Sequence, residues 1–328
     1  MKKILGMGNA LVDILIQLDG DSILDVLGLP KGSMQLVDAD RSNQILDALK
    51  DHKRGVSAGG SAANTIHGLA KLGVPVGYIG VIGEDELGGS FVMDMINAGV
   101  EPHMIHSARE TGRAVGLITP DSERTFATYL GAAIELVSEH LNPDIFKKYD
   151  YFHIEGYLVQ NHQLIERAVK IAKENNLIVS LDLSSYNIVE ANLAFLHEII
   201  EKYVDIVFAN EEEARAFTGM EPYEAVLEIS KKCHVAVVKT GSKGSLIKSN
   251  NDLTEIGVVP VTPLDTTGAG DLYAAGFLYG HSLGNSLKEC GDIGALMAGN
   301  VIEVLGSKMN DVQWGKIFSH LGNKENKS

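Results

Sequence analysis

Short apolar runs alternate with helix-like segments along most of this chain, and this alternation restricts the fold more than any other feature. The clearest runs are rich in Val and Ile and lack strict alternation with polar residues; they cover 74–83, 149–156, 176–183, 204–210 and 234–240. Strands that are buried on both faces of a parallel sheet have this composition. The pattern predicts an α/β fold with a doubly wound, mostly parallel sheet flanked by helices.

Helix start and stop signals lie between these runs. In the segment 61–73, Ser61 is placed to cap a helix and Gly73 to end it. Asn142 followed by Pro143 is another helix start, because proline lacks the N–H that the first helical position leaves unpaired. Both signals place helices between predicted strands.

Two stretches depart from the alternation. Residues 11–37 and 103–132 contain short alternating segments and no long helix. We expect them to form a small separate β-sheet that covers a site as a lid. The large α/β domain, which would bind nucleotide and substrate, then comprises 1–10, 38–102 and 133–321, and only the tail 322–328 looks disordered.

Charge and composition exclude several classes of partner. The 328 residues carry a formal net charge of −15, which argues against nucleic acid and against an anionic membrane surface. No apolar run reaches the ~20 residues of a membrane span. Asn9 and Asp13 interrupt the apolar start, so we interpret it as strand rather than signal peptide. Cys233 and Cys290 form no C-x-x-C pair, which fits a reducing, cytoplasmic location.

The strongest motif is the segment 263–277, PLDTTGAGDLYAAGF. Gly268, Ala269 and Gly270 lie at a turn that opens an apolar helix, where unpaired amides and the helix dipole form an anion site. Asp271 stands in the first turn, where a carboxylate can accept the proton of an attacking hydroxyl. An ordinary helix start is the alternative interpretation.

A second motif is AGGSAAN, residues 58–64. Gly59 and Gly60 open a helix and let backbone amides approach a sugar hydroxyl, while Asn64 adds a hydrogen-bond donor and an acceptor. A tight turn into a helix that Ser61 caps explains the same residues without a ligand.

Two further segments follow predicted strands. Asn210 and Glu213 come after the strand near 204–209, where carboxylates are well placed to arrange Mg²⁺ near phosphates. A capping box is the alternative. The loop KTGSKGS (239–245) lacks the spacing of a Walker A loop, and it either faces a nucleotide or turns into a hairpin.

Together these motifs resemble the PfkB (ribokinase-like) family of carbohydrate and nucleoside kinases, over nearly the whole chain. The family's G-G-x-x-x-N signature corresponds to Gly59, Gly60 and Asn64, and its D-T-x-G-A-G-D signature to Asp265–Asp271. The resemblance implies ATP and Mg²⁺ as cofactors. It also implies Asp271 as the catalytic base, with Gly268, Ala269 and Gly270 as the anion hole for the transferred phosphoryl group.

The resemblance implies further roles. Asn210 and Glu213 match an N-x-x-E motif that organises Mg²⁺ and phosphates, with Glu213 acting on the metal through water. Thr240 and Gly241 match a nucleotide-contacting loop, and Asn300 falls where a late helix lines the adenine pocket. Asp265 and Thr267 match a monovalent-cation site, which implies K⁺ as a further cofactor.

Within the family, the adenosine kinase branch is the most similar. Residues 6–14 resemble its opening strand, in which Asp13 would hold ribose hydroxyls. That branch stacks the purine between aromatic rings; Tyr157 can serve, but Leu158 and Asn187 stand where aromatics are expected. A sugar or sugar-acid kinase of the ribokinase, fructokinase or 2-keto-3-deoxygluconate kinase type is therefore the alternative. Arg124 in the lid would either reach a charged acceptor or phosphate or lie on the surface.

Two other classes compete with a kinase. A binding protein that lost its chemistry would keep the pocket, but the intact Asp271 and its glycines argue against it. A nicotinamide-dependent dehydrogenase would need a G-x-G-x-x-G motif, and GMGNAL (6–11) lacks the third glycine. The expected partner is a small nucleoside or sugar, and the sheet edges of the lid are suited to pair two copies as a homodimer.

Overall fold

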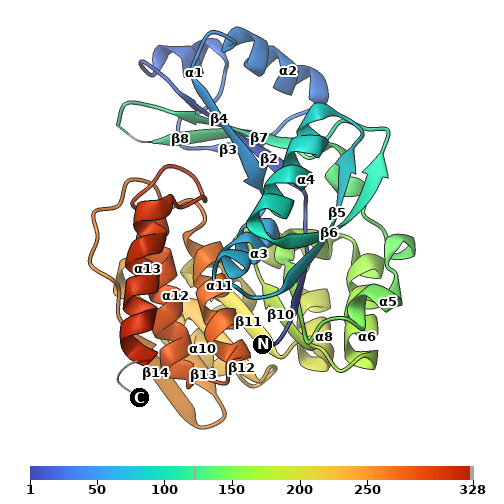
Figure 1. Ribbon diagram of the computed structural model, residues 1–328, viewed down its shortest axis with the longest axis vertical. Helices are drawn as coiled ribbons and strands as arrows, with labels where there is room; N and C mark the ends of the chain where they lie inside the picture. Colours follow the sequence, from blue (N-terminus) through green and yellow to red (C-terminus); the bar gives the residue numbers. More distant parts are fainter. Residues whose placement is uncertain (122, 326–328) are drawn as a thin grey trace.

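The computed structural model describes residues 1–121 and 123–325, which build two β-sheets (Figure 1). The larger sheet has nine strands: β1 (Ile4–Met7), β5 (Val76–Gly83), β6 (Val100–Ser107), β9 (Tyr151–Glu155), β10 (Ile178–Asp182), β11 (Ile206–Asn210), β12 (Val235–Lys239), β13 (Ser245–Ser249) and β14 (Asp252–Ile256). The smaller sheet has five: β2 (Leu11–Gln17), β3 (Met34–Leu36), β4 (Arg54–Gly59), β7 (Gly112–Ile118) and β8 (Arg124–Tyr129).

The order of the larger sheet is β14-β13-β12-β11-β10-β9-β1-β5-β6. Every neighbouring pair from β12 to β6 is parallel. The two remaining pairs, β12 with β13 and β13 with β14, are antiparallel. The chain builds outward from β1 first toward β6 and then, from β9, toward β12. The prediction of a doubly wound, mostly parallel sheet is therefore confirmed, and β1 marks the point where the winding reverses.

Helices cover both faces of this sheet. The described helices are α1 (Ser22–Val26), α2 (Ala39–Ala48), α3 (Ser61–Lys71), α4 (Glu86–Ala98), α5 (Pro143–Phe146), α6 (His162–Glu174), α7 (Tyr186–Ala191), α8 (Leu193–Tyr203), α9 (Glu211–Thr218), α10 (Pro222–Ile229), α11 (Ala269–Ser282), α12 (Leu287–Val301) and α13 (Asp311–Glu325). In β11, Ile206 and Phe208 join the apolar core under α3, α11 and α12, while Val207 and Ala209 join the core under α6 and α8–α10. This alternation explains why the strand is apolar at nearly every position.

The smaller sheet contains more of the chain than the sequence indicated. We expected it from 11–37 and 103–132, but β4 (54–59) pairs antiparallel with β2 along its whole length. Conversely, β6 (100–107) pairs with β5 in the larger sheet. Both expected boundaries are wrong. The first misses β4 because its sequence, RGVSAG, has neither an apolar run nor alternation to mark it. The second includes 103–107 although these residues continue strand β6, which starts at Val100 and pairs with β5.

The C-terminal segment is helical further than expected. Helix α13 continues to Glu325, so residues 322–325 are not disordered as predicted, and 326–328 lie outside the described residues. Trp314 and Ile317 anchor this helix in the core next to α12. Within the described part of the chain, no helix combines the length and the apolar character needed to cross a membrane.

Candidate active site

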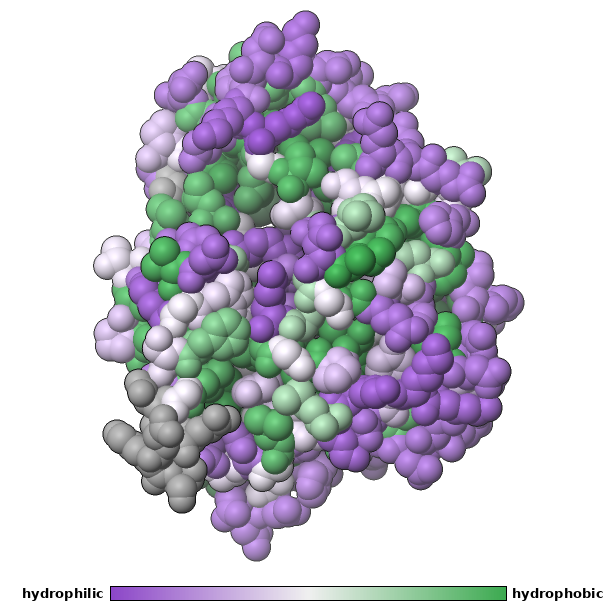
Figure 2. Space-filling model, in the orientation of Figure 1, coloured by the Kyte–Doolittle hydropathy of each residue, from purple (hydrophilic) through white to green (hydrophobic). Residues whose placement is uncertain are grey.

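A cavity of about 1110 Å³ lies at the carboxyl ends of β9–β12, between the two sheets. In Figure 2 the molecule is hollowed between its upper part, which carries the small sheet, and the main body, and hydrophobic surface extends into this hollow. Open α/β sheets bind ligands at this edge, near the point where the winding reverses. The cavity is therefore the candidate active site.

The turn before α11 has the geometry of an anion site. Gly268 has a φ of 76°, in the left-handed region that favours glycine, and it stands directly before the helix. A Cβ at Gly268 would lie 2.7 Å from Cβ of Ser307, so no larger residue fits. Gly270 and Asp271 in the first turn line the cavity. Within the described residues the amides of Gly268 and Gly270 have no partner, and that of Ala269 donates to the Thr266 carbonyl at 3.2 Å, so the turn offers donors to an anion.

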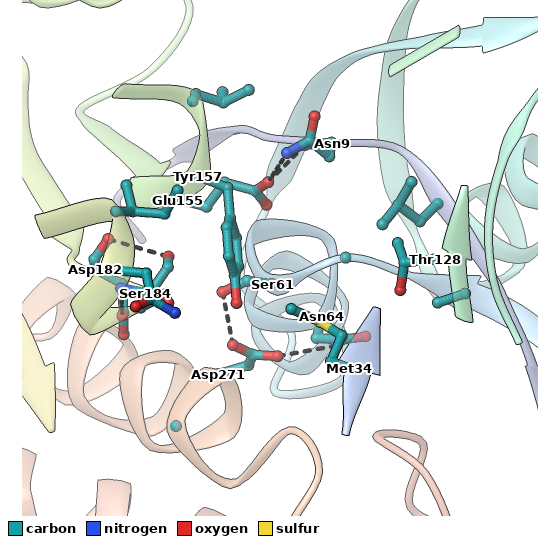
Figure 3. A pocket seen from close by; sticks show the side chains of 18 of the residues that line it. Asn9, Met34, Ser61, Asn64, Thr128, Glu155, Tyr157, Asp182, Ser184 and Asp271 are labelled. Carbon is teal, nitrogen blue, oxygen red and sulfur yellow. Dashed lines mark hydrogen bonds between the residues drawn. The ribbon is translucent and has the colours of Figure 1, made fainter. Parts of the chain in front are cut away.

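Two side chains from α3 hold the Asp271 carboxylate (Figure 3). The Ser61 hydroxyl donates to Oδ1 at 2.7 Å, and the Asn64 amide donates to Oδ2 at 2.9 Å. Burial raises the pKa of Asp271 to about 6, although both hydrogen bonds lower it. A carboxyl group with this pKa is ionised at neutral pH and accepts a proton more readily than an exposed aspartate, as a general base must.

Ser61 does not cap α3 as its sequence position suggested. The N-cap is Gly60, with a φ of 97°, and no side chain caps this end. A Cβ at Gly60 would lie 2.2 Å from the Asn9 carbonyl oxygen, so glycine is required by close packing. The Ser61 hydroxyl is therefore free to bind Asp271, a role that the sequence reasoning missed.

Asn64 is largely buried but still lines the cavity. Its Oδ1 accepts a 2.8 Å hydrogen bond from the Ser307 hydroxyl while its Nδ2 binds Asp271. Both polar atoms are thus used to orient the base. Since Asn64 also lines the cavity, its expected contact with the acceptor stays a prediction.

Asp13 lines the cavity from β2, and burial raises the pKa of its carboxyl to about 7. Gly59 lies in the paired strand β4, opposite Leu11, and a Cβ there would lie 2.2 Å from Asp13 Oδ1. Gly59 therefore makes room for this carboxylate rather than lining the cavity itself. The two predicted acceptor residues lie together, as their shared sheet requires.

The last residues of four adjacent strands form a polar row: Glu155, Asp182, Asn210 and Lys239 end β9, β10, β11 and β12. All four line the cavity. Sequence reasoning singled out only Asn210. The signal that could have found the others is that each is the charged residue that ends a mainly apolar strand.

Glu155 connects three elements. It accepts hydrogen bonds from the Asn9 backbone at 2.9 Å, from the Asn9 side chain at 2.7 Å and from the Ala62 backbone at 3.0 Å (Figure 3). Burial raises the pKa of Glu155 to about 7. This glutamate fixes the N-terminus of α3, and with it Ser61 and Asn64.

Asn210 and Glu213 form the capping box that the sequence allowed. The Asn210 side chain accepts from the Glu213 backbone, and Glu213 accepts from the Asn210 backbone and side chain, each at 2.8 Å. Both residues also line the cavity. Burial, and then the charge of Asp182, raise the pKa of Glu213 to about 7. The remaining lone pairs of Asp182 and Glu213 fit a hydrated Mg²⁺ that arrives with nucleotide phosphates.

Of the other residues predicted to contact the nucleotide, only one lines the cavity. Gly241 lines the cavity, whereas Thr240 is buried and lines a smaller neighbouring pocket. Asn300 lines neither and donates within α12 to the Leu296 carbonyl at 2.9 Å. The structure therefore does not bring Asn300 to the site.

Arg124 occupies the predicted monovalent-cation site. From β8 its guanidinium pairs with the Asp265 carboxylate and donates to the Thr267 hydroxyl at 2.7 Å. Asp265 also accepts from the backbone N–H groups of Thr267 and Gly306. Because a guanidinium already neutralises this carboxylate, the residues do not fit K⁺. Arg124 is also not the surface arginine that we considered, because its side chain is 9% exposed, while its contact with a ligand stays a prediction.

The acceptor end of the cavity has a largely apolar lining. Tyr157 points into the cavity from the turn after β9, and Leu158 and Phe126 line it as well. Asn187 lines the wall as well, so only one aromatic ring stands among the positions expected to stack a base. Of the described residues that line the cavity, Lys239 is the only lysine or arginine. Lys308 and Arg124 do not line the cavity, although both act electrostatically on Asp13.

A doubly wound sheet, an amide turn and a carboxylate beside it define a ribokinase-like kinase that phosphorylates small hydroxyl compounds. The chain belongs to the pfkB family of carbohydrate kinases, whose family model matches residues 33–312. This confirms the resemblance seen in the motifs and excludes a nicotinamide-dependent dehydrogenase.

Relatives include both sugar and nucleoside kinases. A probable sugar kinase from Rhizobium etli CFN 42 has a similar structure with a TM-score of 0.88 and 32% identity, covering 97% of this chain and 98% of that one. The adenosine kinase from Sinorhizobium meliloti gives 0.87 and 34%, covering 98% and 99%. The adenosine kinase of Schizophyllum commune is 26% identical, covering 96% and 98%. The chain is thus a sugar or nucleoside kinase.

Proposed function

We propose that this kinase transfers the γ-phosphoryl group of ATP to the hydroxymethyl group of a nucleoside, with adenosine as the best candidate. The observation that carries the proposal is the position of Asp271. Its carboxylate is held by α3 at the amide-lined start of α11 and borders a cavity whose far end is apolar.

The chemistry requires a base and charge stabilisation. The acceptor oxygen attacks the γ-phosphorus while the bond between that phosphorus and ADP breaks. Asp271 receives the proton of the acceptor hydroxyl. The amides of residues 268–270 bind the charge on the transferring group. Mg²⁺, when bound with ATP, neutralises phosphate oxygens near Asp182 and Glu213. The small sheet acts as the lid that excludes water.

The acceptor end favours a neutral, partly apolar ligand. Asp13 is placed to accept hydrogen bonds from ribose hydroxyls, while Phe126, Leu158 and Tyr157 offer apolar surface for a base. A sugar acid would need a cation in contact with its carboxylate, and among the described lining residues the only lysine or arginine is Lys239, at the phosphate end. A neutral sugar such as ribose or fructose is the competing acceptor, because it needs no such cation.

Acceptor-dependent ATP consumption tests this proposal. We expect adenosine to give the highest kcat/KM in a panel with inosine, ribose, fructose and 2-keto-3-deoxygluconate, and Asp271→Asn to abolish the adenosine signal. A preference for ribose or fructose would replace the nucleoside by a sugar. ATP turnover that ignores every acceptor, or persists in Asp271→Asn, would overturn the proposal.

A further inference from the structure

Lys239 lies against the anion site although the motif that forms this site contains no lysine. It is the last residue of β12, and its Nζ would lie 3.0 Å from a Cβ built on Gly270. That amino group is the nearest atom to the position that a side chain at residue 270 would occupy, so a residue larger than glycine would push against it. Gly270 therefore serves to admit a lysine from the neighbouring strand end.

The ammonium group of Lys239 is held but not saturated. Within the described residues it donates one hydrogen bond, to Asp182 Oδ2 at 2.8 Å, so two of its three N–H groups remain for a ligand. The two side chains are 15% and 6% exposed, so little water competes with the pair. Asp182 is itself fixed, because its Oδ1 accepts from the Ser184 backbone at 2.9 Å.

The surrounding charges keep Lys239 protonated. Burial alone lowers the pKa of its amine, but the carboxylates of Asp182, Glu213 and Asp271 outweigh burial, and the net shift of the pKa is upward. Among the described residues that line the cavity, Lys239 is the only cationic side chain, so it is the side-chain positive charge that borders the space a phosphate would fill.

We propose that Lys239 is a further catalytic residue, which binds the transferring phosphoryl group together with the amides of residues 268–270 while Asp182 keeps its ammonium group in place. This inference rests on the proposed function. Lys239 exchanges no proton: the bond from phosphorus to ADP breaks, the bond to the acceptor oxygen forms, and the acceptor's proton goes to Asp271. Its fixed charge stabilises the oxygens of the moving group.

Steady-state kinetics of Lys239→Met and Lys239→Arg test the role. Loss of one such charged donor lowers kcat by about 10²–10³-fold. We expect this for Lys239→Met with little change in KM for adenosine, and partial recovery in Lys239→Arg. Lys248→Met on the adjacent strand β13, whose amine binds the Asn250 carbonyl, is the matched control and should keep wild-type kinetics.

A double variant separates this role from a purely structural ion pair. Lys239→Met leaves Asp182 buried without its partner, and adding Asp182→Asn removes that charge as well. Because Asp182 is also placed to act on Mg²⁺, the double variant is compared with Asp182→Asn alone. If Lys239 only neutralises Asp182, the double variant turns over no more slowly than Asp182→Asn. If Lys239 binds phosphoryl, the double variant is as stable as Asp182→Asn but slower, and it loses the tight binding of ADP–aluminium fluoride with adenosine.

The outcomes distinguish the two proposals. Wild-type protein that phosphorylates no acceptor in the panel overturns the proposed function. Wild-type protein that is active, together with a Lys239→Met variant at near wild-type kcat or a double variant no slower than Asp182→Asn, overturns only the role of Lys239.

Discussion

The Asn64 side-chain amide donates a 2.9 Å hydrogen bond to the Asp271 carboxylate, although the two residues are 207 positions apart in the chain. Ser307 fixes the other end of the same amide at 2.8 Å. The two sequence signatures of the family thus meet in one contact, and the orientation of the proposed base depends on α3 as much as on its own helix.

Removing the Asn64 amide should shift the pH dependence of the reaction. A hydrogen bond donated to a carboxylate lowers its pKa, so Asn64→Ala raises the pKa of Asp271 above its present value of about 6. We expect the acid limb of the kcat profile to move to higher pH. Turnover below that limb should fall about tenfold, since a hydrogen bond to a charged group contributes about 1.5–3 kcal/mol.

The control for this prediction lies at the far end of α11. Ser282 donates there to the Tyr279 carbonyl, away from the cavity. Ser282→Ala should leave the kcat profile in place. If the acid limb of Asn64→Ala coincides with that of wild type, the hydrogen bond from Asn64 does not lower the pKa of Asp271.

Asp271→Asn should inactivate the enzyme and stabilise it at neutral pH. Loss of a general base costs about 10²–10⁴ in kcat. The pKa of Asp271 is about 6 in the folded protein against 3.8 for an unperturbed aspartate, so the folded form binds the proton more tightly than the unfolded chain does. This carboxylate therefore costs stability as pH rises between these two values, and the cost is complete above about pH 6.

Thermal unfolding measures that second effect. The difference in melting temperature between Asp271→Asn and wild type should be positive at pH 8, equivalent to about 1 kcal/mol because the carboxylate keeps some exposure to the cavity. It should shrink toward pH 4, where the aspartate is protonated in the folded protein and partly protonated in the unfolded chain. A difference that does not change with pH would show that the pKa is not raised.

Gly268→Ala should destabilise the protein and damage the site. The new methyl group would require a left-handed backbone at a φ of 76° and would lie 2.7 Å from Ser307 Cβ. We expect a loss of about 1–3 kcal/mol in unfolding free energy, with lower kcat because Ser307 supports Asn64. Denaturant unfolding provides the measurement.

Gly315→Ala is the matched glycine substitution. Gly315 lies inside α13 with open space around it, so alanine should stabilise the helix by about 0.5–1 kcal/mol. Equal effects of the two substitutions would mean that the left-handed turn at Gly268 carries no special requirement.

Arg124 predicts an enzyme that does not need K⁺. Its guanidinium and the Asp265 carboxylate are 9% and 1% exposed, and breaking a buried pair costs about 3–5 kcal/mol. Wild-type activity and melting temperature should be the same in KCl and in tetramethylammonium chloride. Arg124→Met should melt at a lower temperature and regain part of the difference in KCl.

Arg109→Met serves as the comparison for that experiment. Arg109 pairs with Glu135 on the surface, where the two side chains are 46% and 41% exposed, and such pairs contribute about 0–1 kcal/mol. Its melting temperature should barely change in either salt. A wild-type enzyme that requires K⁺ would show that the guanidinium does not replace the ion.

Contiguous features of the site could be predicted from the sequence. The turn 265–271 and the glycines 59–60 are local arrangements, so glycine content and the chemistry of a helix start identify them. The strand ends Glu155, Asp182 and Lys239 could not be assigned in this way. Each is a single charged residue at the end of a mainly apolar strand, and this weak signal does not separate a site residue from an ordinary strand end.

Two errors have a similar origin. Ser61 has the preference of a capping residue, but the close packing of Gly60 on Asn9 changes the start of the helix and frees the hydroxyl. Strand β4 has no strand pattern of its own and forms because β2 offers it an edge to pair with. In both places a contact with a distant segment overrides the local preference.

By itself the sequence determined the alternation of strands and helices, and with it the parallel sheet, because burial on both faces requires continuous apolar runs. It also determined the amide turn and its aspartate, which need only neighbouring residues. Only the tertiary structure decided that Lys239 faces Gly270, that Asn64 holds Asp271 and that Arg124 covers Asp265. These contacts join segments whose separation along the chain leaves no periodic signal, and packing of the two sheets around one cavity creates them.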